Sequence, residues 1–213
     1  SGKGADDFPI VALGSSAGGL KSLEMFLSHV PEKSGICFVV ISHTDPDRTS
    51  LLPDILKRSS SILVKHIESG MAPRQNTVYL PPSNRDVILE QGNFHLKERP
   101  KRTALHMPID LFFESLANAC GERAGCVILS GTGTNGTHGL RLIKEAGGVV
   151  LAEDKVSAGH YGMPGSAIDT GLVDFVLEPA KMPVQLADYF KYPATLAMDA
   201  DSARIKNGKK IPE

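Results

Sequence analysis

The sequence predicts an α/β fold: a doubly wound, mostly parallel sheet with helices on both faces and an added β-hairpin. Two observations lead to this prediction. Short runs of apolar and β-branched residues recur along the chain, as expected for parallel strands that are buried on both faces. Between these runs lie segments whose apolar residues repeat with the period of a helix. The 213 residues are enough for a core that needs neither disulfides nor a structural metal.

The first half of the chain begins the alternation of strands and helices. A strand is expected at residues 10–13, and a helix at residues 20–30, where the apolar residues fall on one face. The next expected elements, in order, are a strand at 36–41, a helix at 51–57, a strand at 62–67 and a strand at 78–80. Residues 86–98 alternate in character around Gln91, Gly92 and Asn93, which predicts a β-hairpin that interrupts the alternation.

The alternation resumes after a basic loop at residues 99–102. The expected elements are a helix at 109–120, a strand at 126–129, a helix at 137–146, a strand at 149–152, a helix near 164–170, a strand at 174–177 and a helix at 184–190. From residue 191 onward the sequence is polar and without periodicity. We therefore expect an N-terminal extension (1–7), one domain (8–190) and a polar linker or tail (191–213).

Charge and hydropathy exclude several classes of partner. The 23 Lys and Arg residues are balanced by 24 Asp and Glu residues, so the chain has no basic excess for nucleic acid. No apolar run approaches the length of about 18 residues that a membrane-spanning helix needs. The N-terminus lacks the apolar core of a secretory signal. We therefore expect a cytoplasmic protein without membrane insertion.

The cysteines and histidines indicate no metal site. Cys37, Cys120 and Cys126 are odd in number and lack metal-site spacing, so we expect buried structural thiols rather than a disulfide framework. The histidines are scattered along the chain without the spacing of metal ligands. We expect neither a metal nor another cofactor.

A glycine-rich turn at residues 14–19 follows the first predicted strand, where parallel sheets place their functional sites. Gly14, Ser16 and Gly18 match the hydrolase pattern G-x-S-x-G in one register. This register predicts that Ser16, not Ser15, is a nucleophile beside the N–H groups of a helix start. The alternatives are a phosphate-binding turn and a plain strand-to-helix connection with a serine N-cap.

His43 follows the second predicted strand and is expected at the same edge of the sheet as Ser16. Imidazole titrates near neutral pH and is the usual base for a serine nucleophile. We therefore predict that His43 is the general base. The alternative is a structural histidine with no part in catalysis.

A second glycine-rich loop, residues 130–136, supports two interpretations. Gly131, Gly133 and Gly136 satisfy the dinucleotide pattern G-x-G-x-x-G, with Glu153 or Asp154 near the distance expected of a ribose-binding acid. Such a pattern normally opens the first βα unit of a domain, whereas this one comes late. In the other interpretation, the loop brings Asn135 to the edge that carries Ser16 and His43. The chain order Ser, His, Asn differs from that of α/β-hydrolases.

Four segments together carry a family resemblance: residues 14–19, the strand ending at His43, residues 129–136 and residues 162–168 (Gly-Met-Pro-Gly-Ser-Ala-Ile). From Phe8 to Phe190 the chain resembles the catalytic domain of the chemotaxis protein-glutamate methylesterases (CheB type). The resemblance implies a hydrolase that removes methyl groups from glutamyl methyl esters on the cytoplasmic helices of chemoreceptors, with release of methanol, and that often deamidates receptor glutamines.

One subgroup of this family is fused to a methyltransferase domain and to sensory modules, and the chain resembles it most. The similarity lies in residues 8–11, 26–31 and 171–174. It implies that the polar residues after 191 lead into a further domain.

The resemblance also implies roles for individual residues. Ser16 matches the nucleophile and His43 the general base, while the backbone N–H of Ala17 stabilises the oxyanion and the loop at Thr132 and Gly133 borders the pocket. The family usually has Thr at the Ala17 position and Met at the Thr132 position.

Asn135 stands where the family has an aspartate as its third triad member. An amide can orient an imidazole but does not offset the charge of an imidazolium. The sequence therefore predicts a slow Ser-His-Asn hydrolase, and leaves open a catalytically weakened domain that binds receptors or signalling partners.

Overall fold

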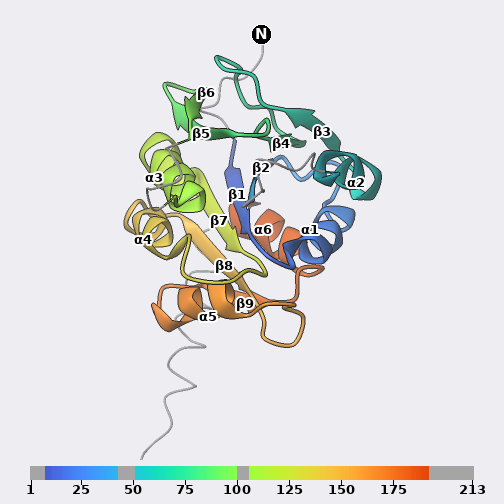
Figure 1. Cartoon of the computed structure of the whole chain (residues 1–213), viewed down its shortest axis with the longest axis vertical. Helices are drawn as coiled ribbons and strands as arrows, with labels where there is room; N and C mark the ends of the chain where they lie inside the picture. The colour runs from blue at the N-terminus through green and yellow to red at the C-terminus, as the bar shows by residue number, and fades with distance from the viewer. Residues whose placement is uncertain (1–7, 43–50, 100–105, 192–213) are drawn as a thin grey trace, which may run out of the picture.

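The computed structural model describes residues 8–42, 51–99 and 106–191, and within these ranges it confirms the predicted fold class (Figure 1). The strands of the main sheet are β1 (Ile10–Ser15), β2 (Cys37–Ser42), β3 (Leu63–His66), β4 (Thr77–Leu80), β7 (Ala124–Ile128), β8 (Val149–Glu153) and β9 (Phe175–Leu177). They pair in parallel in the order β3-β4-β2-β1-β7-β8-β9.

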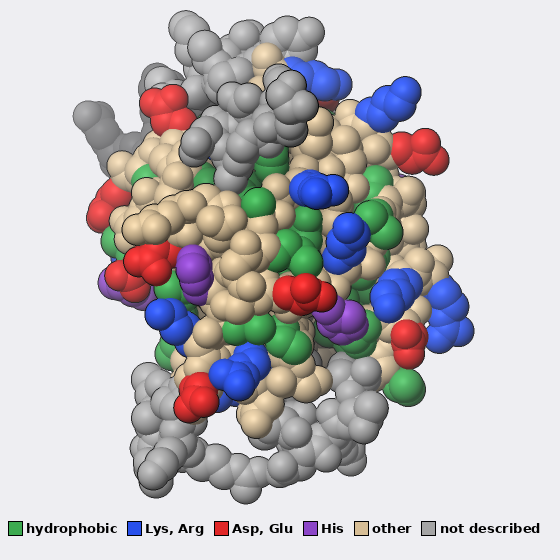
Figure 2. Space-filling model, turned by 90° about the horizontal axis from the view of Figure 1, so that it is seen from above, with side chains coloured by type: hydrophobic (Ala, Val, Ile, Leu, Met, Phe, Trp, Pro, Cys, Tyr) green, Lys and Arg blue, Asp and Glu red, His purple; other side chains and the backbone are tan. Residues whose placement is uncertain are grey.

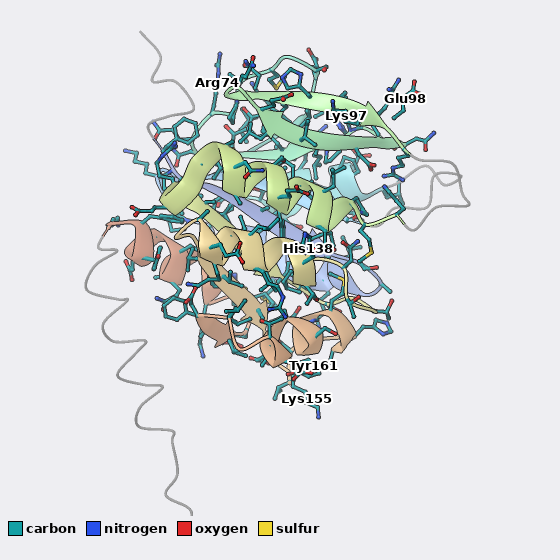
Figure 3. All side chains as sticks on the ribbon, turned by 90° about the vertical axis from the view of Figure 1, so that its left-hand side faces the viewer. Arg74, Lys97, Glu98, His138, Lys155 and Tyr161 are labelled. Atoms are coloured by element: carbon teal, nitrogen blue, oxygen red, sulfur yellow. The ribbon has the colours of Figure 1, made fainter. Side chains whose placement is uncertain are left out.

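Helices cover both faces of this sheet. One face carries α1 (Gly19–Ser28), α2 (Leu52–Ser59) and α6 (Met182–Lys191). The other carries α3 (Pro108–Cys120), α4 (Thr137–Glu145) and α5 (Gly162–Asp169), which lie in front of the sheet in Figure 3. The fold is therefore a three-layer sandwich.

The central strand β1 explains why the apolar runs are continuous. Ile10 and Ala12 pack into the core under α3, α4 and α5, whereas Val11 and Leu13 pack into the core on the opposite face. All four are fully buried. Because alternate residues of a strand point to opposite faces and both faces are covered by helices, every position must be apolar.

Prolines account for the early starts of three helices, α3, α5 and α6. Helix α3 begins at Pro108, one residue before the prediction, while α5 and α6 each begin two residues before it. Pro164 and Pro183 lie in the first turns of these two helices. Proline is tolerated there because the N–H groups of the first turn have no partner within the helix.

The predicted hairpin is also confirmed. Strands β5 (Arg85–Glu90) and β6 (Asn93–Glu98) pair antiparallel outside the main sheet. Gln91 and Gly92 join them with φ angles of 50° and 76°, as a two-residue type I′ turn requires. The ring of Phe94 lies 5.0 Å from that of Tyr79 in β4, so the hairpin packs against the main sheet.

The three cysteines are free thiols and are buried, as predicted. Burial raises the pKa of the Cys37 and Cys126 thiols, which disfavours the reactive thiolate. These two residues lie in β2 and β7 and contribute to the core beneath α3. Their role is structural.

The surface of the described part of the chain is mixed in character. None of the helices in that part combines the length and the apolar character that a bilayer crossing requires. On the face seen in Figure 2, most Lys and Arg side chains lie over the right-hand half with acidic side chains among them, and acidic side chains are more frequent on the left. This face therefore offers no uniform basic surface to a polyanion.

Candidate active site

The order of the strands creates a crevice between β1 and β7. The chain leaves β1 for β2 on one side, whereas it leaves β7 for β8 on the other side. The two loops that follow β1 and β7 therefore diverge, and ligands of open α/β sheets bind at such a switch point. The predicted nucleophile and the predicted third residue lie in these two loops.

The turn after β1 exposes one of its two serines. Ser15 is the last residue of the strand and is 1% exposed, whereas Ser16 is partly exposed. Gly18 has a φ of 74°, which glycine adopts without strain and which allows α1 to start immediately afterwards. This geometry presents the Ser16 side chain, and not that of Ser15, to solvent.

Backbone hydrogen bonds fix the turn around Ser16. Its N–H donates to the carbonyl oxygen of Ser130 at 3.0 Å, and its carbonyl accepts the N–H of Gly19 at 3.0 Å. Within the described part of the chain, the N–H groups of Ala17 and Gly18 have no acceptor. Two N–H groups at a helix start are thus available to an anionic ligand.

The loop after β7 approaches this turn through a glycine. A Cβ atom added to Gly131 would lie 2.9 Å from the Cβ of Ser16 and 2.4 Å from the Sδ of Met163, so a side chain has no room there. The carbonyl of Gly131 accepts the N–H of Met163 in α5 at 2.8 Å. Thr132 and Gly133, which follow, are exposed at the tip of the loop.

Asn135 is held at the opposite end of the same loop. It is 6% exposed, and its Oδ1 accepts the N–H of Asp110, in the first turn of α3, at 3.2 Å. The carboxylate of Asp110 in turn accepts the N–H of Gly139, in the first turn of α4, at 2.7 Å. The N-terminal turns of two helices therefore meet at Asn135.

The predicted general base, His43, lies outside the described residues. The strand before it ends beside the nucleophile turn, because Ser42 of β2 pairs with Ser15 of β1. The structure thus brings the loops of Ser16 and Asn135 to one edge of the sheet and leaves the position of His43 a prediction.

A hollow that is open to solvent lies on the β2 side of this edge. Ser42, Leu80 and Pro108 contribute to its wall, together with Asp86, which is 4% exposed. The imidazole of His106 donates from Nε2 to both carboxylate oxygens of Asp86 at 2.9 Å. The hollow is therefore next to the strand that leads to His43.

Sequence reasoning did not predict the hydrogen bonds that four polar residues make around the nucleophile turn: Ser22, Ser130, Glu153 and His160. Glu153 is fully buried and accepts hydrogen bonds from the Ser22 hydroxyl at 2.9 Å and from the Ser130 N–H at 2.7 Å. His160 donates its N–H to the Ser130 hydroxyl at 2.8 Å, and its ring lies against Gly18. An acidic residue at the end of an otherwise apolar strand was the only sequence signal.

The burial of Glu153 argues against its role in the dinucleotide interpretation. In the dinucleotide interpretation, Glu153 was a candidate for the acid that binds a ribose hydroxyl. Its carboxylate is instead enclosed in the protein and occupied by two protein donors. In the ranges that the structure describes, no three His, Cys, Asp or Glu side chains come close enough together to hold a metal ion.

The chain matches a known protein family over most of its length. The family model described as CheB methylesterase matches residues 11–186. The protein-glutamate methylesterase/protein-glutamine glutaminase of Thermotoga maritima is 33% identical over 183 residues, covering 84% of this chain and 53% of that protein. The Moorella thermoacetica protein of the same name is 34% identical over 173 residues, covering 79% and 41%. The chain thus spans about half the length of these relatives or less.

Solved structures give the same result for the fold. The crystal structure of the Thermotoga maritima CheB methylesterase catalytic domain matches with a TM-score of 0.79 at 33% identity, covering 85% of this chain and 98% of that domain. The C-terminal CMP-Kdo binding domain of WaaA from Acinetobacter baumannii matches with a TM-score of 0.51 at 12% identity, which is a likeness of fold alone.

Proposed function

Because the chain belongs to the CheB methylesterase family, we propose that it hydrolyses glutamyl methyl esters of chemoreceptors and releases methanol. The observation that carries the proposal is the partly exposed Ser16, on a tight turn at the switch point of the sheet. The names of the relatives include a protein-glutamine glutaminase activity, so deamidation of receptor glutamines is proposed as a second reaction of the same site.

In the proposed mechanism, Ser16 is the nucleophile and His43 the general base. His43 takes the hydroxyl proton as the Ser16 oxygen attacks the ester carbonyl. The methoxide leaves with that proton as methanol, so that a glutamyl ester of Ser16 remains. His43 then takes a proton from water as the water oxygen attacks this ester, and returns that proton to the Ser16 oxygen as the glutamyl group leaves with the new oxygen as glutamate. In deamidation, ammonia leaves in place of methanol.

The oxyanion of each tetrahedral intermediate is assigned to the turn that follows Ser16. The Ser16 N–H is occupied by Ser130, whereas the N–H groups of Ala17 and Gly18 are unoccupied among the described residues. This supports Ala17 as an oxyanion donor. Thr132 and Gly133, exposed beside the turn, are proposed to border the pocket that receives the glutamyl side chain.

Asn135 is proposed to orient His43 as an amide in place of a carboxylate. It is held to the α3 N-terminus through Oδ1, which supports a fixed orientation of its amide. A neutral side chain does not stabilise the imidazolium that forms during the reaction. The same observation favours a second candidate function, a weakened domain that binds methylated receptors with little turnover.

The proposed partners follow from this substrate. They are the methylated cytoplasmic helices of chemoreceptors, which would place the protein in the cytoplasm. A methyltransferase domain and sensory modules in a longer chain are proposed as further partners.

Methanol release from methylated receptor membranes tests the proposal. We expect release by this chain, and none by Ser16→Ala. Binding of methylated receptor without release above the Ser16→Ala background would favour the second candidate function. Absence of both would contradict the proposal.

A further inference from the structure

A single buried carboxylate lies beneath the nucleophile turn. Glu153, the last residue of β8, is 0% exposed. Its oxygens accept the hydroxyl of Ser22 at 2.9 Å and the N–H of Ser130 at 2.7 Å. Among the described residues, no Lys, Arg or His forms an ion pair with it. These two donors stabilise a charge that would otherwise be costly to bury.

These two donors belong to different segments, a helix and a loop. Ser22 lies in α1, six residues after Ser16, and Ser130 opens the loop after β7. Glu153 itself ends the strand that leads into a third connection, which returns to the same place when the His160 N–H donates to the Ser130 hydroxyl at 2.8 Å. One side chain therefore links helix α1, which follows the nucleophile turn, to the loop after β7, and that loop also binds the connection after β8.

The link continues to the nucleophile through one residue. Glu153 binds the N–H of Ser130, and the carbonyl of the same residue accepts the N–H of Ser16 at 3.0 Å. Ser22 fixes the helix that starts directly after the turn. The carboxylate thus restrains both sides of the turn: the Ser130 backbone that binds Ser16, and the helix α1 that follows Ala17 and Gly18.

From this arrangement we infer that Glu153 is a positioning residue for the Ser16 turn. It holds the Ser130 carbonyl where it binds the Ser16 N–H, and so keeps Ala17 and Gly18 as the N–H groups that face the reacting oxyanion. The inference rests on the proposed function. Glu153 acts through Ser130 and Ser22 and makes no contact with substrate.

Two substitutions at Glu153 distinguish the effect of its hydrogen bonds from the effect of its negative charge. Glu153→Ala removes both acceptors, and we expect kcat for a small activated ester to fall by about tenfold or more, with KM within about twofold. Glu153→Gln keeps one oxygen to accept the Ser130 N–H, and its amide can donate to the Ser22 hydroxyl. We expect this variant to retain kcat within about threefold of the parent chain. Glu145→Ala, at an exposed position of α4, is the matched control and should leave kcat unchanged.

Hydrogen exchange of the Ser16 amide tests the same inference without depending on esterase activity. By NMR, the Ser16 amide should exchange its hydrogen about tenfold faster in Glu153→Ala than in the parent chain, and near the parent rate in Glu153→Gln. If the parent chain has no esterase activity, the proposed function fails, and this exchange rate alone decides the role of Glu153.

Three results would overturn the inference: parent-like kcat in Glu153→Ala, a Glu153→Gln variant that folds but is as slow as Glu153→Ala, or unchanged Ser16 exchange in Glu153→Ala. If Glu153→Ala does not fold, Ser22→Ala decides, because it removes only the contact to α1. A kcat lowered by about threefold or more, with KM and the unfolding midpoint retained, supports the inference. An unchanged kcat contradicts it.

Discussion

The two loops that meet at the site are anchored by opposite means. The turn of Ser16 is held by the carboxylate of Glu153, which accepts hydrogen bonds from Ser22 and Ser130. Asn135, in the second loop, is restrained by a backbone N–H at the start of α3. The acidic side chain, Glu153, therefore lies beneath the nucleophile, which in the proposed mechanism needs only to be held in place. The neutral side chain, Asn135, lies where a negative charge would stabilise the proposed imidazolium.

This difference separates two requirements of a serine hydrolase. The nucleophile and the oxyanion donors must be held in place, which hydrogen bonds achieve whether or not the acceptor is charged. The base must also be stabilised as it becomes an imidazolium, which requires a negative charge close to it. Substitutions at the nucleophile turn and at Asn135 should therefore change turnover in different directions and by different amounts.

The largest effect is expected at the nucleophile. Ser16→Ala should lower esterase turnover by about 10³-fold or more, because no other group takes its place. An organophosphonate should label the parent chain at Ser16, as read by peptide mapping. Ser15→Ala is the matched control and should keep its turnover, because Ser15 is buried at the end of β1. A label on Ser15, or one that survives Ser16→Ala, would contradict the assignment.

The general base should give the next largest effect. His43→Ala should lower turnover by about 10²-fold or more, and the activity of the parent chain should rise with pH as the imidazole loses its proton. His29→Ala serves as the control, because the His29 ring binds the Met25 carbonyl at the end of α1. A pH–rate profile that His43→Ala leaves unchanged in shape and height would show that another group is the base.

In the loop after β7, Asn135→Asp should increase esterase activity. We expect turnover to rise by about tenfold or more, because one carboxylate oxygen can keep the Asp110 N–H while the other stabilises the imidazolium. Kinetics of the two chains measured side by side check this. Asn135→Ala, which loses the anchor without gaining a charge, should be slower than the parent chain.

Equal or lower turnover in Asn135→Asp would have a specific meaning. The carboxylate of Asp110 lies close by and is held by the Gly139 N–H, so repulsion between two acids would disfavour the new charge. Alternatively, another acid serves His43, and Asp45 and Asp47, outside the described residues, are the nearest in sequence. In either case Asn135 would be adapted to its site.

The smallest effect concerns stability. Asp110→Ala removes the acceptor of an N–H in the first turn of α4 and should lower the free energy of unfolding by about 1 to 2 kcal/mol. Urea denaturation measures it. Asp54→Ala is the control, since Asp54 lies in the first turn of α2 but is exposed. An equal loss in both variants would show that Asp110 acts through its own helix only.

Local patterns were sufficient to predict most of the fold. Strand β1 was predictable because four consecutive apolar residues imply burial on both faces. The hairpin was predictable because residues 86–98 alternate in character on both sides of Gln91, Gly92 and Asn93. Ser16 and Asn135 were expected at one edge because carboxyl ends of parallel strands meet there, and the structure brings their loops together. Their catalytic roles stay predictions.

Interactions between distant residues could not be predicted. Glu153 binds a hydroxyl 131 positions earlier in the chain, and Asn135 binds a backbone N–H 25 positions away. No periodicity encodes either contact, since both depend on how the sheet order brings the loops together. The sequence indicated an acid at the end of β8, but a buried anchor and a ribose ligand give the same local pattern.

The chain separation between Ser16 and Glu153 has a consequence for synthesis on the ribosome. A nascent chain that has just completed β2 already carries Ser16, but the carbonyl that binds the Ser16 N–H arrives with residue 130, and the carboxylate beneath it with residue 153. Contacts of such high sequence separation form late, after most of the sheet is assembled. The hydrogen bonds that hold the Ser16 turn from beneath are therefore complete only when β8 has joined the sheet.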